Sequence, residues 1–214
     1  PFRMSLSMTQ LLFLRHGLTD WNAERRMQGR RDITLNDDGR AMVAAWRLPS
    51  EFADLPVVAS PLVRCRESAE ILKANNPGLG PITFDDRLVE KHWGVWEGRN
   101  LHEMEAELGD EAHRGDYRPE GGESRQDMLP RISDALADLA ADPAPRIVVA
   151  HRGVIRAVYA LATGWDLTGE SPDEMSRRKA QVFRAAPDGS AKIDQLNMSL
   201  ADPATTRTNT WSTP

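Results

Sequence analysis

Three short apolar runs constrain the fold of this chain more than any other feature. They are Leu11–Leu14, Leu55–Ala59 and Ile147–Ala150, and a polar segment follows each of them. A continuous apolar run of about four to eight residues, bounded by polar residues, is typical of a strand buried on both faces. Helical patterns lie between the runs. We therefore predict an α/β protein of three layers, α/β/α, with a largely parallel central sheet.

Further elements follow from spacing and turn chemistry. A fourth short strand is predicted over 82–84, and a hairpin over 181–184 and 192–196, where Pro187-Asp188-Gly189 supplies the turn. The predicted helices cover Gly39–Phe52, Ser60–Ala74, Leu101–Leu108, Glu123–Ala141 and the segment from His151 to Thr163.

Capping signals set the expected ends of these helices. Ser60-Pro61 predicts an N-cap followed by proline at the first helical position. Asn100 and Glu103 have the spacing of a capping box. Pro130 is expected to break or kink its helix near the start. Gly164 is the expected residue just past the end of the helix that follows His151.

Charge and cysteine content exclude several classes of function. The 214 residues contain 27 Lys and Arg against 32 Asp and Glu, a formal charge of −5. A general nucleic-acid binder needs a net basic face, so nucleic acid is not an expected partner. A single cysteine, Cys65, excludes an internal disulfide framework and a Cys-rich zinc site, and it fits a reducing compartment.

The sequence also bears on location and domain organisation. No apolar run approaches about 18 residues, so we expect no membrane span. The first ten residues do not resemble a signal peptide, and a cytoplasmic protein is expected. We predict a flexible lead-in over residues 1–7, a single domain over 8–200 and a loose tail over 201–214.

The chemistry is expected where two of the apolar strands end. Arg15-His16-Gly17 follows the first strand, and His151-Arg152-Gly153 follows the last. In open α/β sheets ligands bind outside the carboxyl ends of the strands, so both histidines are expected to face one crevice. Arg64, in the first turn of its predicted helix, adds a cation. Gly17 would allow the backbone to approach a ligand closely.

Such a crevice suits a phosphate group. Guanidinium groups match phosphate oxygens, and free N–H groups at the start of the helix after His151 form an anion site. Fixed donors stabilise charge that develops in a transition state, and a histidine can attack phosphorus as a nucleophile.

These residues belong to a longer series of motifs. In chain order they are Leu12–Gly17, Thr19, Asn22, Gln28-Gly29, Asp32, Leu35, Gly39, Ser60–Arg64, Ala69, Leu88–Glu90, Gly94–Gly98, Gly121–Ser124, Val149–His151, Gly153–Arg156 and Leu196-Asn197. The series, over about residues 10–197, resembles the histidine phosphatase superfamily, also called the phosphoglycerate-mutase-like family, and in particular its phosphatase branch.

The resemblance implies roles for the residues of the crevice. His16 would be the nucleophile that becomes phosphohistidine. Arg15, Arg64 and His151 would complete the phosphate pocket, and Asn22 would add a donor. The resemblance implies no cofactor and no metal ion, because the arginines supply the positive charge. The partner would be a small phosphorylated metabolite, and a homodimer is common among relatives.

The resemblance also implies an acid and two departures from the family pattern. Glu90 would protonate the leaving oxygen and then activate water as a base, a sensible role for a carboxyl group beside a leaving alkoxide. Leu18 stands where the family usually has Gln or Glu, which puts recognition of the leaving group in doubt. Arg152 stands where glycine is frequent, and it either narrows the pocket or adds an anion contact.

Two alternatives remain beside a metal-independent phosphomonoester hydrolase. One is a cofactor-dependent phosphoglycerate mutase, but only Arg99–Glu120 separates two of the motifs, where mutases carry a longer insertion. A short insertion suggests an open pocket, which favours hydrolysis. The other is a non-catalytic protein that binds phosphorylated ligands on the same fold, which the complete set of site residues disfavours.

Other reactive residues are not expected to take part in the reaction. A cysteine phosphatase would need arginine where the sequence after Cys65 has Ile71. We expect Trp93 and Trp96 in the core rather than against substrate. The remaining histidines are expected at the surface or in loops; they are His92, His102 and His113.

Overall fold

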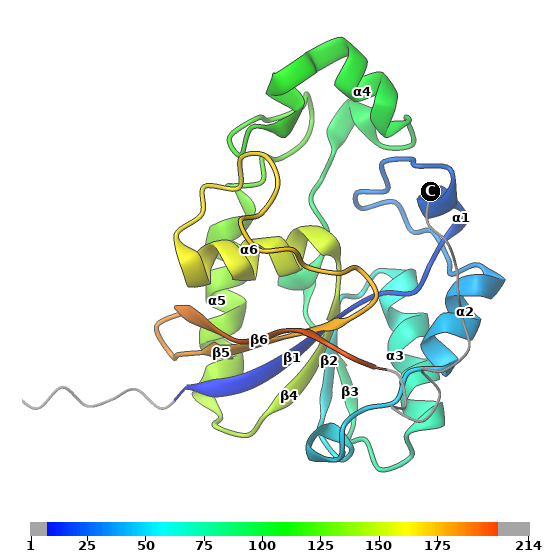
Figure 1. Cartoon of the computed structure of the whole chain (residues 1–214), viewed down its shortest axis with the longest axis vertical. Coiled ribbons are helices and arrows are strands. Elements are labelled where there is room, and N and C mark those ends of the chain that lie inside the picture. The colour runs from blue at the N-terminus through cyan, green and yellow to red at the C-terminus, as the bar shows by residue number, and fades with distance from the viewer. Residues whose placement is uncertain (1–7, 201–214) are drawn as a thin grey trace, which may run out of the picture.

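A six-stranded sheet forms the centre of the molecule (Figure 1). The computed structural model describes residues 8–200, so the predictions for residues 1–7 and 201–214 lie outside the described residues. The strands, in the spatial order β3-β2-β4-β1-β5-β6, have these bounds: β1 Thr9–Arg15, β2 Val57–Ala59, β3 Ile82–Phe84, β4 Arg146–Ala150, β5 Ala180–Ala185 and β6 Ala191–Met198.

The sheet is mixed but mostly parallel. Strands β1, β2, β3 and β4 pair in parallel, while β5 pairs antiparallel with β1 and with β6. The hairpin of β5 and β6 is the one that the Pro187-Asp188-Gly189 turn predicts. Helices cover both faces of the sheet, so the predicted α/β/α fold is confirmed (Figure 1).

The helices divide between the two faces. Their bounds are α1 Asp20–Ala23, α2 Asp37–Ala44, α3 Val63–Asn75, α4 Leu101–Leu108, α5 Met128–Ala141 and α6 Arg152–Thr163. Single turns of 3₁₀ helix cover 50–52, 86–88, 94–96 and 109–113. In β1, Leu11 and Phe13 pack with α5 and α6, whereas Leu12 and Leu14 pack with α2 and α3. Both faces of β1 are therefore buried, as its continuous apolar run predicts.

Several helix ends differ from the predictions. Helix α3 begins at Val63 with Leu62 as N-cap. The Ser60 hydroxyl lies 2.8 Å from the imidazole of His151 and 3.4 Å from the N–H of Leu62, so it is shared with the site instead of serving the helix alone. Helix α2 ends at Ala44, well before Phe52. Helix α5 begins at Met128, so Pro130 sits in its first turn, where the missing N–H would have no helical partner anyway.

At α4 half of the predicted capping box is present. The side chain of Asn100 accepts a hydrogen bond from the N–H of His102, whereas Glu103 pairs with Arg99 at 3.3 Å instead of turning back to the cap. At the end of α6, Gly164 adopts the predicted left-handed conformation, with φ of 79°.

A small cap stands over the carboxyl edge of the sheet. It carries α4 and the 3₁₀ turn that follows, at the top of the molecule in Figure 1. A separate apolar cluster of Met27, Trp96, Met104 and Ala112 holds the cap together, so the prediction of a core position is confirmed for Trp96. Within residues 8–200, no helix is long and apolar enough to cross a membrane.

Candidate active site

The ends of three adjacent strands build the site. In the sheet Arg15 pairs with Ala150 and Ala59 with Val149, so β1, β4 and β2 end at one level. His16, His151 and Ser60 are the next residues along the chain. The structure brings the two predicted histidines together, with ring centroids 5.3 Å apart.

His16 is held as a neutral base. Its Nδ1 lies 2.7 Å from the carbonyl oxygen of Gly17, and a ring nitrogen that faces a carbonyl must carry the proton. We therefore assign the unprotonated nitrogen to Nε2. Burial, followed by the positive charges of Arg15 and Arg64, lowers the pKa of His16 well below its usual range. At neutral pH the ring keeps a free lone pair.

Two buried guanidinium groups flank this imidazole. Arg64 is fully buried, and its terminal nitrogens donate to the carbonyl oxygens of Arg31 and Gly29, both at 2.8 Å. Within the described residues, the Nε atoms of Arg15 and Arg64 are buried without a hydrogen-bond partner. Burial lowers the pKa of Arg15 to about 10, which still leaves it charged at neutral pH. These two donors suit an oxyanion.

Glu90 lies against the beginning of α6. Its Oε1 accepts a hydrogen bond from the N–H of Lys91 at 2.8 Å, and its Oε2 accepts one from the N–H of Gly153 at 3.1 Å. A Cβ at Gly153 would stand 2.0 Å from Oε1, so only glycine leaves room for the carboxylate here. Burial lowers the pKa values of Arg15 and Arg64, and the negative charge of Glu90 opposes this lowering at both, which places the carboxylate near the two guanidinium groups.

A cavity of about 470 Å³ joins these groups. Six of the eight predicted site residues line it: Arg15, His16, Asn22, Arg64, Glu90 and Arg152. The Oδ1 atom of Asn22 accepts from the N–H of Thr19 at 3.2 Å, so the amide nitrogen is the part left to donate to a ligand.

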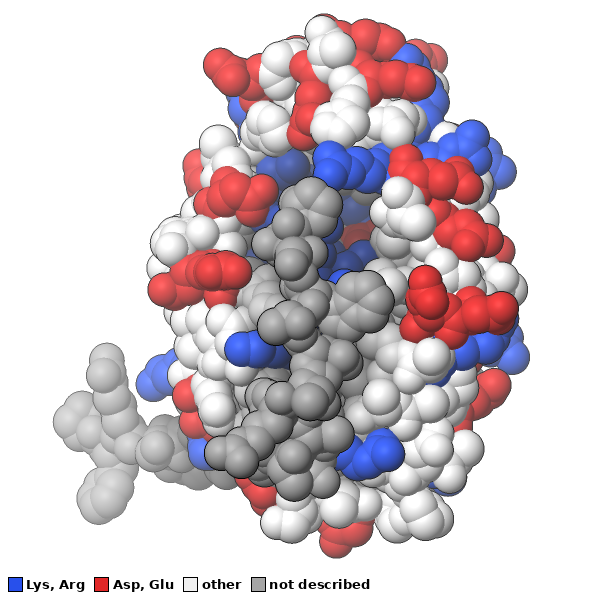
Figure 2. Space-filling view, turned by 45° about the vertical axis from the view of Figure 1, so that its right-hand side comes forward, with Lys and Arg blue, Asp and Glu red and all other residues white. Residues whose placement is uncertain are grey.

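Positive charge dominates the cavity wall. Among the described residues that line it, Glu90 is the one carboxylate, while nine are basic: Arg15, Arg25, Arg26, Arg64, Lys91, Arg125, Arg152, Arg156 and Arg177. Figure 2 shows Lys and Arg side chains inside a hollow beneath the cap, whose outer surface is largely acidic. A chain of net charge −5 thus concentrates cations at one place.

His151 and Gly17 do not line the cavity. His151 is fully buried, with its Nε2 2.8 Å from the Ser60 hydroxyl. The N–H of Gly17 donates to the hydroxyl of Ser68 at 3.0 Å, and a Cβ at Gly17 would stand 2.8 Å from the carbonyl oxygen of Gly39. Close packing against α2 therefore requires this glycine, and the approach of a ligand to its backbone stays a prediction.

The departure at Leu18 also lies outside the cavity wall. Its carbonyl oxygen accepts from the N–H of Asn36, and its backbone packs against Gly39, where a Cβ would stand 2.1 Å from that oxygen. Leu18 itself therefore contributes no side chain to the cavity wall. Arg152 does line it, and its guanidinium lies 3.2 Å from Glu170.

The structure does not favour Cys65 or the remaining histidines as the nucleophile. Burial raises the pKa of Cys65 to about 12, so it stays a thiol at neutral pH, as the failed spacing of the cysteine motif predicts. The side chains of His92, His102 and His113 are 37%, 61% and 47% exposed, which confirms their surface positions, although His113 also lines the cavity. Within residues 8–200 no three His, Cys, Asp or Glu side chains could jointly hold a metal ion.

Sequence reasoning missed two features of the cavity wall. Lys91 is only 3% exposed, and its Nζ lies 3.4 Å from the ring centroid of Trp93. Burial lowers the pKa of this ammonium to about 7. Trp93 was expected in the core, but it also lines the cavity. The adjacency of Lys91 to the predicted acid Glu90 is the signal that could have found it.

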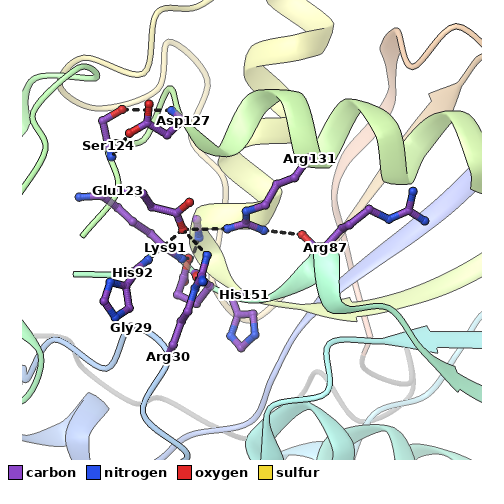
Figure 3. A network of polar contacts seen from close by, with 12 residues as sticks. Gly29, Arg30, Arg87, Lys91, His92, Glu123, Ser124, Asp127, Arg131 and His151 are labelled. Atoms are coloured by element: carbon purple, nitrogen blue, oxygen red, sulfur yellow. Dashed lines mark hydrogen bonds and ion pairs between the residues drawn. The ribbon is translucent and has the colours of Figure 1, made fainter. Parts of the chain in front are cut away.

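Glu123, in the Gly121–Ser124 motif, contacts the segment that follows Glu90 (Figure 3). One oxygen of Glu123 accepts from the N–H of His92 at 2.9 Å, from Arg30 at 3.0 Å and from Arg131 at 3.1 Å. Arg131 also donates to the carbonyl oxygen of Arg87. Glu123 therefore joins the loop after Glu90 to α5 and to the loop that carries Gly29.

Glu97 also joins the loop that carries Gly29 to the loop after Glu90. Its Oε1 accepts from the N–H groups of Arg30 at 2.9 Å and Trp93 at 3.3 Å. A Cβ at Gly29 would stand 2.1 Å from that oxygen, and the carbonyl of Gly29 in turn accepts from Arg64. The motif residues outside the cavity thus fix the positions of those inside it.

Comparison with known proteins agrees with this arrangement. The model of the histidine phosphatase superfamily, branch 1, matches residues 11–190. The chain belongs to this superfamily. It is therefore an enzyme of the histidine phosphatase and phosphoglycerate mutase family, and the motifs that carry the predicted site residues all lie within the matched range.

Relatives of similar sequence identity to this chain include both phosphatases and a mutase-like protein. The chain is 36% identical over 173 residues to a glucosyl-3-phosphoglycerate phosphatase of Mycolicibacterium vanbaalenii, covering 74% of this chain and 76% of that one. It is 37% identical over 160 residues to phosphoglycerate mutase-like protein 4 of Arabidopsis thaliana, covering 70% and 69%. A solved structure of mycobacterial glucosyl-3-phosphoglycerate phosphatase matches with a TM-score of 0.72 at 27% identity, over 90% of this chain and 100% of that one.

Proposed function

We propose that this enzyme hydrolyses a phosphomonoester of a small metabolite through a phosphohistidine at His16, without a metal ion. The observation that carries the proposal is the state of His16, whose Nδ1 proton is held by the Gly17 carbonyl at 2.7 Å. The other nitrogen is unprotonated and lies beside two guanidinium groups. A nucleophile needs that free lone pair, and the transferring phosphoryl group needs that positive charge.

In the first step the Nε2 lone pair of His16 forms the bond to phosphorus while the ester P–O bond breaks. Arg15 and Arg64 donate to the phosphoryl oxygens, with their free Nε atoms and their charge. Glu90, protonated at the start, gives its proton to the leaving alkoxide, and the alcohol departs.

In the second step Glu90, now a carboxylate, takes a proton from water. The water oxygen forms a bond to phosphorus, the P–N bond breaks, and its electron pair returns to Nε2. Phosphate leaves, Glu90 has its proton again, and one water molecule is consumed. Backbone N–H groups of Lys91 and Gly153 hold the carboxylate in one place for both steps.

The size of the site supports a metabolite as substrate. A volume of about 470 Å³ lies in the range of small-molecule pockets. The Arg99–Glu120 insertion is short, but through Leu101 and Met104 it reaches the cavity wall. The glucosyl-3-phosphoglycerate phosphatases among the relatives support a phosphorylated sugar or acid as the substrate class.

The test compares phosphate release from a panel of phosphomonoesters in EDTA by the parent enzyme, His16→Ala and His102→Ala. His102 is exposed and lies outside the cavity wall, so it is the matched control. We expect release by the parent and the control, and a loss of at least about a thousandfold in His16→Ala. An alkaline quench with labelled substrate should trap label on His16.

The other outcomes identify the alternatives. Interconversion of 2- and 3-phosphoglycerate without net release would make the enzyme a mutase. Phosphate binding without labelled histidine would indicate a non-catalytic binding protein. Undiminished release by His16→Ala would disprove the proposed nucleophile.

A further inference from the structure

Four guanidinium groups gather on one side of the cavity. We call Arg125, Arg152, Arg156 and Arg177 the arginine cluster; all four line the cavity. Arg152 and Arg156 are four residues apart on α6 and therefore lie on the same face of the helix. The positive charge of Arg152 lowers the pKa values of Arg125 and Arg177, and those of Arg125 and Arg177 lower that of Arg156. The four groups are thus close enough to repel one another.

The charge of this cluster is poorly balanced. The carboxylate that acts on all four members is Glu170, which lies 3.2 Å from Arg152 and 3.1 Å from Arg156. The side chain of Glu170 is 82% exposed, while that of Arg156 is 9% exposed. Of the four guanidinium groups only that of Arg156 belongs to a buried residue, and a solvated carboxylate neutralises a buried cation weakly. One carboxylate among four guanidinium groups leaves the cluster with a net positive charge. Anions that enter the cavity would relieve this repulsion.

A second cavity shares the same side chains. It has a volume of about 360 Å³, and Arg15, Arg152, Arg156 and Arg177 line both cavities. The remaining wall comes from α6 and from the segment between Glu170 and Gln181. Because Arg15 also belongs to the proposed phosphate pocket, a phosphoryl group beside His16 would lie next to the cluster.

We propose that the arginine cluster binds a second anionic group, a carboxylate or a phosphate, of the same molecule whose phosphomonoester lies at His16. In the absence of that group, Glu170 occupies the guanidinium groups of Arg152 and Arg156. The inference rests on the proposed function and narrows its substrate class to phosphomonoesters that carry a further negative charge. It also gives Arg152, the departure from the frequent glycine, a role in specificity.

The test measures equilibrium binding to the full chain carrying His16→Ala, so that no turnover disturbs the titration. Two matched pairs of probes differ in the second anion. Glycerol 3-phosphate and 3-phosphoglycerate differ by a carboxylate, and fructose 6-phosphate and fructose 1,6-bisphosphate differ by a phosphate. We expect the second member of at least one pair to bind about tenfold more tightly, a gain typical of charge-assisted hydrogen bonds.

Three further variants in the same background test the residues. Arg152→Gln with Arg177→Gln should remove most of that preference while the affinity for the first member of each pair changes less than about threefold. Glu170→Gln should increase the preference, because it removes the competing carboxylate. Arg40→Gln removes one positive charge from α2, outside the walls of both cavities, and should leave the preference unchanged.

The opposite signs separate a specific subsite from a damaged fold, since a damaged fold would not bind the dianionic probes more tightly in Glu170→Gln. Equal binding within both pairs would overturn the inference, as would equal losses for both members in the arginine variants. Phosphate release by the enzyme without such a preference would leave the proposed function standing alone. A preference without release by the parent enzyme would instead disprove hydrolysis and keep the subsite.

Discussion

The contacts of a side chain in this site determine what that side chain can do in the reaction. Glu90 touches two backbone N–H groups and has guanidinium neighbours on several sides, yet it is the residue proposed to carry a proton to the leaving group. The rate increase that a general acid provides grows with the basicity of the leaving oxygen. That dependence gives a direct test of its role.

Substitution Glu90→Gln should therefore affect poor leaving groups most. For an alkyl phosphate we expect kcat to fall by about a hundredfold to ten-thousandfold. For 4-nitrophenyl phosphate, whose phenolate leaves without a proton, the formation of phosphohistidine should fall far less, and hydrolysis of the intermediate should become limiting. A burst of nitrophenolate in stopped-flow would show this. Equal losses of the first step for both substrates would contradict a role as acid.

At the scale of one element, the start of α6 combines two demands. It supplies the N–H of Gly153 to Glu90, and it carries Arg152 and Arg156 toward the cavities. Alanine within a helix is ordinarily more stable than glycine by about 0.5–1 kcal/mol. Here, however, a Cβ would stand 2.0 Å from the Glu90 carboxylate.

We expect Gly153→Ala to lower kcat on alkyl phosphates by at least about tenfold through displacement of Glu90, with a smaller effect on KM. A double-mutant cycle with Glu90→Gln gives the diagnostic measurement. If Gly153 acts through Glu90, the second substitution should cost little more once the first is present. Fully additive losses would show that Gly153 serves α6 in another way.

Elements were predictable to different degrees for physical reasons. The strands were found because β1, β2 and β4 are buried on both faces and are therefore continuously apolar. The start of α3 was wrong because the hydroxyl of Ser60 makes its shorter contact, at 2.8 Å, with His151, a residue 91 positions away, and only a longer one, at 3.4 Å, with the N–H of Leu62. Local propensity contains no information about such a partner.

The same distinction holds for the site. Arg15, His16 and Arg64 follow from strand ends and family motifs that are local in sequence. The arginine cluster combines a residue of the loop before α5, the first turns of α6 and the loop before β5, which only tertiary packing brings together. No spacing rule along the chain connects Arg125 with Arg177.

The two buried histidines should make the free energy of unfolding of the whole molecule depend on pH. Burial lowers the pKa values of His16 and His151 well below 6.5 in the folded state. Below about pH 6.5 the unfolded chain therefore binds two more protons than the folded one, and the free energy of unfolding falls as pH falls. The limiting slope is about 2.7 kcal/mol per pH unit.

Urea titrations between pH 5.0 and 6.5 would measure this slope, below the range where Lys91 releases its proton in the folded state. The His16→Ala variant should lose about half of the histidine contribution. An unchanged slope in that variant would mean that His16 is protonated in the folded enzyme, which would also remove the basis of the proposed nucleophile.

The central place of β1 has a consequence for how the protein is made. Both neighbours of β1 come late in the chain, since Leu11 pairs with Arg146 in β4 and with Phe183 in β5. During synthesis the apolar segment 11–14 therefore leaves the ribosome long before either partner exists. Until residue 146 and its neighbours emerge, that segment is a hydrophobic strand with two unpaired edges, which is the kind of surface that chaperones bind and that drives aggregation. The candidate active site is therefore complete only after β4 and β5 have been synthesised and have paired with β1.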